Sequence, residues 1–88
     1  MFNPQSYADQ IEKIGHFSMG SADEIRRDPV GYLDTHCLDA IEETSDEKRE
    51  AVCAFWDKYA EFKGRRIDEM GEDTAEEFVK DFRALCHK

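Results

Sequence analysis

Eighty-eight residues suffice for one folded domain but not for two, so the sequence predicts a single domain over residues 1–88. The 21 acidic and 12 basic residues give a formal net charge of -9. Nucleic acids and anionic membranes are bound mainly through Lys and Arg, so this charge argues against direct binding to either.

Three features of the sequence indicate a cytoplasmic protein. The N-terminus lacks the basic and apolar segments of a secretory signal. No apolar run approaches the roughly 20 residues that a membrane-spanning helix needs. The three cysteines, Cys37, Cys53 and Cys86, cannot all pair within the chain, which is typical of a reducing compartment. We therefore expect the cysteines to be free and to pack as small apolar side chains.

The first predicted helix begins at Asn3 and Pro4, because Asn is a good N-cap and Pro is favoured at the first helical position. Gly15 supplies its stop signal. Apolar residues at helical spacing define its inner face, which comprises Tyr7, Ala8, Ile11 and Ile14. A short second helix is predicted over residues 22–27, with Ser21 as its cap.

The third predicted helix begins with Asp28 as cap and Pro29 at its first position. Spacings of three and four define its inner stripe, which comprises Val30, Leu33, Cys37, Ala40 and Ile41. The opposite side of the same helix carries an aromatic residue, an imidazole and two carboxylates, namely Tyr32, His36, Asp39 and Glu43.

The longest predicted helix follows, and its start is open between two caps. Thr44 and Glu47 have capping-box spacing, whereas Ser45 before acidic residues is an alternative cap. One apolar stripe runs along it, made of Val52, Phe55, Trp56, Tyr59, Ile67 and Met70. Gly64 is a stop signal within this run, but Ile67 and Met70 continue the stripe. We therefore predict one helix to about residue 70, ended by Gly71, with the stem of Lys63 buried mid-stripe.

The last predicted helix has the clearest apolar face of the chain. Either Asp73 or Thr74 caps it, since Thr74 and Glu77 have capping-box spacing. Its inner face comprises Ala75, Phe78, Val79, Phe82, Leu85 and Cys86. Because no segment shows the alternation of a strand, the sequence predicts an all-α, compact single-domain bundle of four short helices, or five with residues 22–27.

Catalysis and metal binding find little support in the residue pattern. The pairs His36-Cys37 and Cys86-His87, with Cys53, contain donors that zinc accepts, but adjacent helical residues point about 100° apart and rarely chelate one ion together. No phosphate-binding, nucleotide-binding or hydrolase motif is present in the sequence. The aromatic residues at helical spacing favour a core over a ligand site. We therefore expect a protein without enzymatic activity, cofactor or metal.

The surface offers two candidate partner-binding regions. The first is the polar side of the third helix, where Tyr32 and His36 stand beside Asp39 and Glu43. Aromatic side chains anchor interfaces, whereas bare charge mainly steers a partner. The second is a helix–helix corner, and its acids are Asp68, Glu69 and Glu72. The acids that follow, up to Glu77, are explained by the favourable interaction of negative charge with a helix N-terminus.

No family motif matches these residues, but in size, charge and helical content the chain resembles small acidic inhibitor proteins. These include phage-encoded antagonists of nucleases or host enzymes and bacteriocin immunity proteins. The leading hypothesis is a non-enzymatic protein that binds a basic surface of another protein, as an inhibitor or a DNA mimic. The alternative is a self-associating subunit, such as a homodimer or an adaptor in a larger complex, that uses Leu38, Phe62 and Phe17 as an apolar interface.

Overall fold

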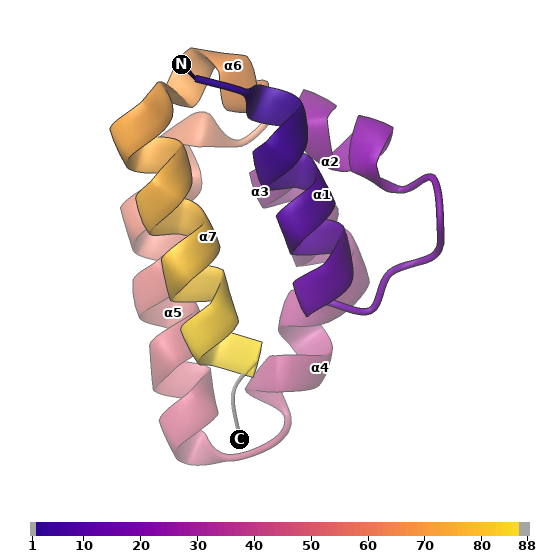
Figure 1. Ribbon diagram of the computed structural model, residues 1–88. Coiled ribbons are helices and arrows are strands. Elements are labelled where there is room, and N and C mark those ends of the chain that lie inside the picture. Colours follow the sequence, from indigo (N-terminus) through magenta and orange to yellow (C-terminus); the bar gives the residue numbers. More distant parts are fainter. Residues whose placement is uncertain (1, 87–88) are drawn as a thin grey trace.

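The computed structural model describes residues 2–86, which form helices and, within that range, no strand, so the predicted all-α fold is confirmed (Figure 1). A π-helical turn, η1, joins α3 to α4, and a 3-10 turn, η2, follows α5. The elements in chain order are α1 (Pro4–Ile14), α2 (Ala22–Arg27), α3 (Pro29–Leu33), η1 (Asp34–Leu38), α4 (Asp39–Glu42), α5 (Asp46–Tyr59), η2 (Ala60–Phe62), α6 (Ile67–Met70) and α7 (Glu72–Cys86).

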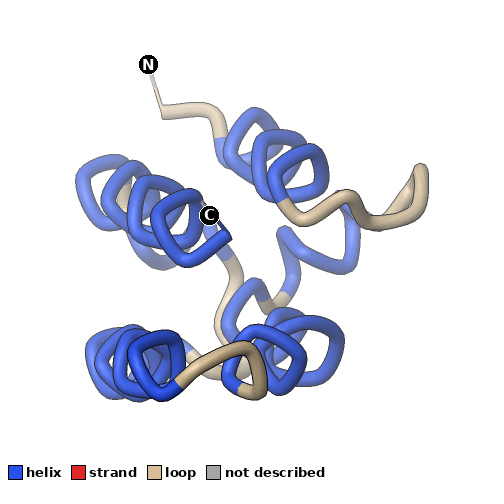
Figure 2. Tube along the Cα trace, turned by 90° about the horizontal axis from the view of Figure 1, so that it is seen from below, coloured by secondary structure: helices blue, strands red, loops and turns tan. Residues whose placement is uncertain are grey.

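Four rods form the body of the molecule. Seen end-on, α1, α7, α5 and the continuous rod α3–η1–α4 surround a common centre (Figure 2). The helix α7 packs between α1 and α5, and α4 packs against α5 across the short turn that joins them. The short helices α2 and α6 complete the domain, and both pack against α1. The predicted four-rod bundle is therefore present, together with the predicted short helix over residues 22–27 and one further short helix, α6.

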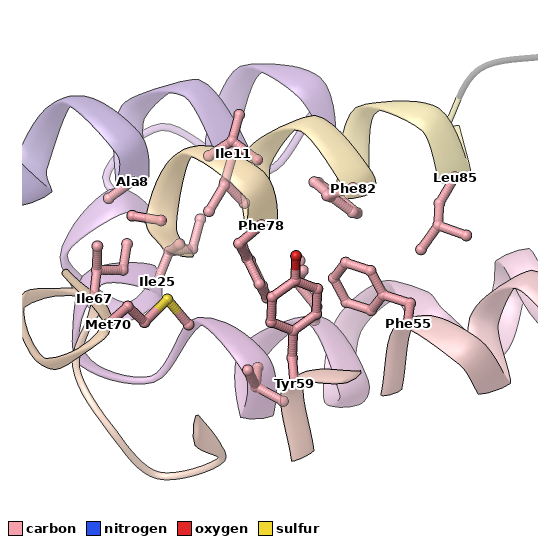
Figure 3. Packing of buried hydrophobic residues seen from close by; sticks show 14 of the residues in the cluster. Ala8, Ile11, Ile25, Phe55, Tyr59, Ile67, Met70, Phe78, Phe82 and Leu85 are labelled. Atoms are coloured by element: carbon pink, nitrogen blue, oxygen red, sulfur yellow. The ribbon is translucent and has the colours of Figure 1, made fainter. Parts of the chain in front are cut away.

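The core lies where the rods meet, and aromatic rings fill its middle (Figure 3). The ring of Phe78 in α7 lies 5.1 Å from that of Phe55 and 4.8 Å from that of Tyr59, both in α5. Such pairs add favourable ring geometry to the free energy of burial. At its edge the Tyr59 hydroxyl donates a hydrogen bond to Asp81 Oδ2 (2.6 Å), while burial and this bond raise the pKa of Tyr59.

Local capping explains most of the helix starts. The side chain of Asn3 accepts a hydrogen bond from Ser6 N, as predicted for the first helix. Of the two caps proposed for α5, Ser45 is the one used, since its Oγ accepts from Lys48 N at 3.1 Å. Ser21, in contrast, makes no side-chain cap to α2. Glu12 Oε2 in α1 accepts from Ala22 N instead (2.8 Å), so a long-range contact performs this function.

The long helix predicted to reach residue 70 is wrong, because the chain turns at Gly64. Its φ of 79° is left-handed, a conformation that glycine adopts without steric cost. The carboxylate of Asp28 accepts a hydrogen bond from Gly64 N (2.8 Å) and so holds the turn against α3. Ile67 is buried as expected, but from the separate helix α6. Lys63 is exposed, rather than buried along its stem.

The inner stripe predicted for the third helix is wrong at Ala40, and it omits Leu38. Leu38 is 2% exposed and belongs to the core, whereas Ala40 is exposed. The π turn is the physical reason, because its wider coil places residues five apart on one face, as Leu33 and Leu38 are. Cys37 and Ile41 lie half-buried at the margin of the core.

The face predicted for the last helix is confirmed. Five of its residues are buried, and the sixth, Cys86, is half-buried against the core. The helix begins at Glu72, directly after Gly71, rather than after a cap at Asp73 or Thr74. Ala75 N donates to Gly71 O (3.0 Å), which closes the first turn.

Candidate functional site

The structure separates the residues predicted to bind a partner into different environments. Tyr32 is half-buried, with its ring edge-on to Phe17 (5.1 Å between centroids) and 4.1 Å from the ring of His36. His36, Asp39 and Glu43 are exposed on the same rod. Tyr32 therefore packs mainly within the molecule, and the charged residues of that set remain on the surface.

The corner acids are largely engaged by neighbours in the chain. Arg26 donates two hydrogen bonds to Asp68 (3.1 and 2.9 Å), and this pairing lowers the pKa of the Asp68 carboxyl. Glu69 accepts from Arg66 N at 3.0 Å, which caps α6. Glu72 is exposed, and its charge adds to burial in raising the pKa of Tyr7. Two of the three corner acids thus stabilise the turn before α7.

A hollow between η1–α4 and α5 gathers a different set of carboxylates, and we call it the acidic groove. Its volume is about 200 Å³. Asp34 and Glu42 are half-buried, while Asp39 and Asp57 are exposed. The eight lining residues are Asp34, Leu38, Asp39, Glu42, Val52, Cys53, Trp56 and Asp57.

Local structure explains how these residues meet. The Ser45 cap reverses the chain, so that α4 and α5 pack side by side. The π turn directs Leu38 into the core, where it forms the floor of the groove with Val52. The carboxylates flank this floor: three come from η1 and α4, and Asp57 comes from α5.

Among the described residues, no cation lies within ion-pair distance of the four groove carboxylates. Acids elsewhere are paired: Lys58 Nζ lies 2.7 Å from Glu77 and 2.9 Å from Asp81. Like charges gathered in a hollow with apolar walls raise the local potential more than charges spread over a surface. Within residues 2–86, the groove therefore gathers carboxylates that no ion pair engages.

Trp56 gives the groove an aromatic wall. It is half-buried, and Lys63 Nζ lies 5.2 Å from the centroid of its ring, within cation–π range. The ring therefore already attracts one cation of this chain. A Lys or Arg side chain from another molecule would find carboxylates for its charged end and Leu38, Val52 and Trp56 for its methylene stem.

Of the predicted partner-binding residues, only Asp39 lines the groove. Asp34 and Glu42 were missed although Glu42 follows Asp39 by three residues on the same helix, because the hollow that gathers them exists only where α4 packs against α5. Trp56 was assigned to the core stripe, yet it lies one position after the buried Phe55 and retains an exposed edge. Its position next to Phe55, about 100° further around the helix, was the signal in the sequence that Trp56 is only partly buried.

No metal centre is found within residues 2–86, where no three His, Cys, Asp or Glu side chains are placed to hold an ion. His87, one of the donors considered, lies outside the described residues. Cys53 is exposed, while Cys37 and Cys86 are half-buried. Burial raises the pKa of the Cys37 thiol to about 12, so that thiol stays protonated at neutral pH.

The exposed apolar interface expected from Leu38, Phe62 and Phe17 is not present. Leu38 is in the core, and the two phenylalanines are half-buried against it.

In the described part of the chain no helix combines the length and apolarity needed to cross a membrane. Comparisons of the chain with protein-family models, curated protein sequences and solved structures found no match.

Proposed function

We propose that this chain is a non-enzymatic protein that binds a basic surface of another protein through the acidic groove. The observation that carries the proposal is the convergence of four carboxylates, none paired with a cation of the described chain, around the partly exposed ring of Trp56. A groove of about 200 Å³ suits one Lys or Arg side chain, which would be the anchor of a larger contact.

The overall charge supports the same proposal at longer range. A net charge of -9 attracts a basic partner and accelerates encounter, and the groove then supplies a defined contact. A partner whose basic surface normally meets nucleic acid would be blocked by such binding. We therefore propose, more specifically, that the protein is an inhibitor that mimics the negative charge of a nucleic acid.

The only tryptophan in the chain lines the groove, so its fluorescence reports binding directly. We expect a short peptide rich in Lys and Arg to change Trp56 fluorescence, with an affinity that falls as salt rises. The triple variant Asp39→Asn, Glu42→Gln, Asp57→Asn should bind the peptide at least about tenfold more weakly. The reason is that a charged contact within a groove contributes more to affinity than one on an exposed surface.

The matched control removes the same three charges from the first two turns of α7, through Glu72→Gln, Asp73→Asn and Glu76→Gln. It should retain nearly all the affinity, measured by displacement of a labelled peptide so that the readout does not depend on Trp56. Equal weakening in the two triple variants would show that only net charge acts and would overturn the groove as the binding site.

A further inference from the structure

A second hollow lies on the other side of α4 from the acidic groove, and we call it the apolar hollow. It is bordered by the end of α1 and the turn after it, by η1–α4, by the first turn of α5, and by the C-terminal end of α7. Its volume is about 580 Å³, within the range of roughly 300–1,000 Å³ typical of small-molecule sites. Its apolar lining consists of Ile14, Phe17, Cys37, Ile41, Leu85 and Cys86.

The described residues that line this hollow differ in charge from the molecule as a whole. Of the described residues that line it, none carries a carboxylate, although the chain has 21. Its ionisable nitrogen groups belong to His16, His36 and Lys48. Lys48 Nζ donates to Leu85 O (2.8 Å), which fixes the ammonium at the end of α7. Because its described lining carries basic side chains and no carboxylate, the hollow suits an anionic ligand better than a cationic one.

His16 is also held in an unusual backbone conformation. Its φ is 55°, the left-handed region, and it is the non-glycine residue with positive φ in the described chain. This conformation ends α1: Phe17 N donates to Glu12 O (3.0 Å) and His16 N donates to Lys13 O (3.3 Å), the hydrogen bonds of a Schellman cap. Here the turn that contains His16 places it on the edge of the hollow, beside Phe17.

We propose that the apolar hollow binds a free medium-chain aliphatic carboxylate. The aliphatic side chains of Ile14, Ile41 and Leu85 contact the hydrocarbon chain, and the ammonium of Lys48 with the two imidazoles meets the carboxylate. The lining contains no arginine, the residue best suited to a phosphate through its planar fork of donors, so a single carboxylate fits better than a phosphate. This proposal is independent of the acidic groove.

The three cysteines allow a test in which one cysteine serves as the control for the other two. Cys37 and Cys86 line the apolar hollow, whereas Cys53 is exposed and lines the acidic groove. Decanoate, below its micelle concentration, is the probe, and iodoacetamide labelling of each cysteine is followed by peptide mass spectrometry. At about ten times its dissociation constant, decanoate should slow labelling of Cys37 and Cys86 about tenfold, by occupancy, and leave Cys53 unchanged.

Ligands that keep the ten-carbon chain of decanoate but carry another head group separate the effect of head-group charge from that of hydrocarbon contact. Decyltrimethylammonium should protect neither cysteine, and decanol should protect both more weakly than decanoate does. Equal protection by the cation and the carboxylate, or no protection of Cys37 and Cys86 by decanoate, would overturn the proposal. Equal slowing at Cys53 would also overturn it, because it would indicate a general change in the protein rather than occupancy of the hollow.

Two neighbouring basic residues provide matched variants. Lys48→Gln should weaken decanoate protection about tenfold and leave decanol protection unchanged, because only the contact with the carboxylate is lost. Arg49→Gln, which removes an exposed charge one residue later, should leave both unchanged. Ile41→Glu, which places a carboxylate in the lining, should abolish decanoate protection. Equal effects of Lys48→Gln and Arg49→Gln would refute the assignment of the head-group contact.

Discussion

At the residue scale, Asp28 connects two distant parts of the chain. Its Oδ1 accepts hydrogen bonds from Gly31 N (2.9 Å) and from Gly64 N (2.8 Å). The first caps α3, and the second holds the left-handed turn that separates α5 and η2 from α6. One carboxylate thus acts both as a local cap and as a long-range clamp.

Replacing Asp28 tests this double function. Asp28→Ala should lower the free energy of unfolding by about 1–2 kcal/mol, because it removes the N-cap acceptor of α3 together with the acceptor for Gly64 N. Asp28→Asn keeps an oxygen acceptor and should lose much less. Urea unfolding measures both. Equal losses in the two variants would mean that the charge of Asp28, rather than its acceptor, stabilises the fold.

At the element scale, the π turn η1 determines what the rod α3–η1–α4 presents on each side. It directs Leu38 into the core and leaves Asp34, Asp39 and Glu42 around the acidic groove. The same rod presents Ile41 to the apolar hollow. A single-turn change of helical pitch therefore positions residues of both candidate sites, in keeping with the frequent occurrence of π turns at functional sites.

Deleting one residue tests the π turn. Removing Thr35, which is exposed, shortens the Leu33–Leu38 spacing from π-helical to α-helical and keeps both leucines on one face. The free energy of unfolding should change by less than about 1 kcal/mol. Removing the exposed Ala54 from α5 should instead cost several kcal/mol, because it rotates part of the buried face into solvent. Thermal melts compare the two, and equal destabilisation would contradict the assigned register.

At the scale of the whole molecule, the distribution of charge matters more than its sum. The described ion pairs engage a minority of the acids, and the groove concentrates several that remain unpaired. The apolar hollow, by contrast, is lined by no described acid. Within residues 2–86, the carboxylates therefore gather at one hollow and are missing from the lining of the other.

This distribution predicts that salt stabilises the protein. Repulsion among the excess carboxylates opposes folding, so raising sodium chloride from about 0.01 M to about 0.5 M should raise the melting temperature by a few degrees. The triple variant Glu72→Gln, Asp73→Asn, Glu76→Gln carries less excess charge and should gain less from salt. A melting temperature that falls with salt would indicate that ion pairs such as Arg26–Asp68 outweigh the repulsion.

Much of the fold could be predicted because its signals lie within a few residues of one another. Asn3, Asp28 and Ser45 cap their helices through amides three residues away. The buried face of α7 follows from helical spacing alone. The candidate site was predicted far less well, since it depends on how α4 packs against α5. Of its carboxylates, only Asp39 was recognised beforehand as part of a surface for binding.

The sequence by itself determined the helical class, the caps Asn3 and Asp28, and the apolar faces of α1 and α7, because caps and periodicity are properties of neighbouring residues. Tertiary structure decided where the chain breaks and which residues meet. Gly64 ends the long run because its turn is held by Asp28, distant in sequence. Leu38 enters the core because a π turn accommodates it. Both outcomes depend on packing between segments, which a local pattern does not contain.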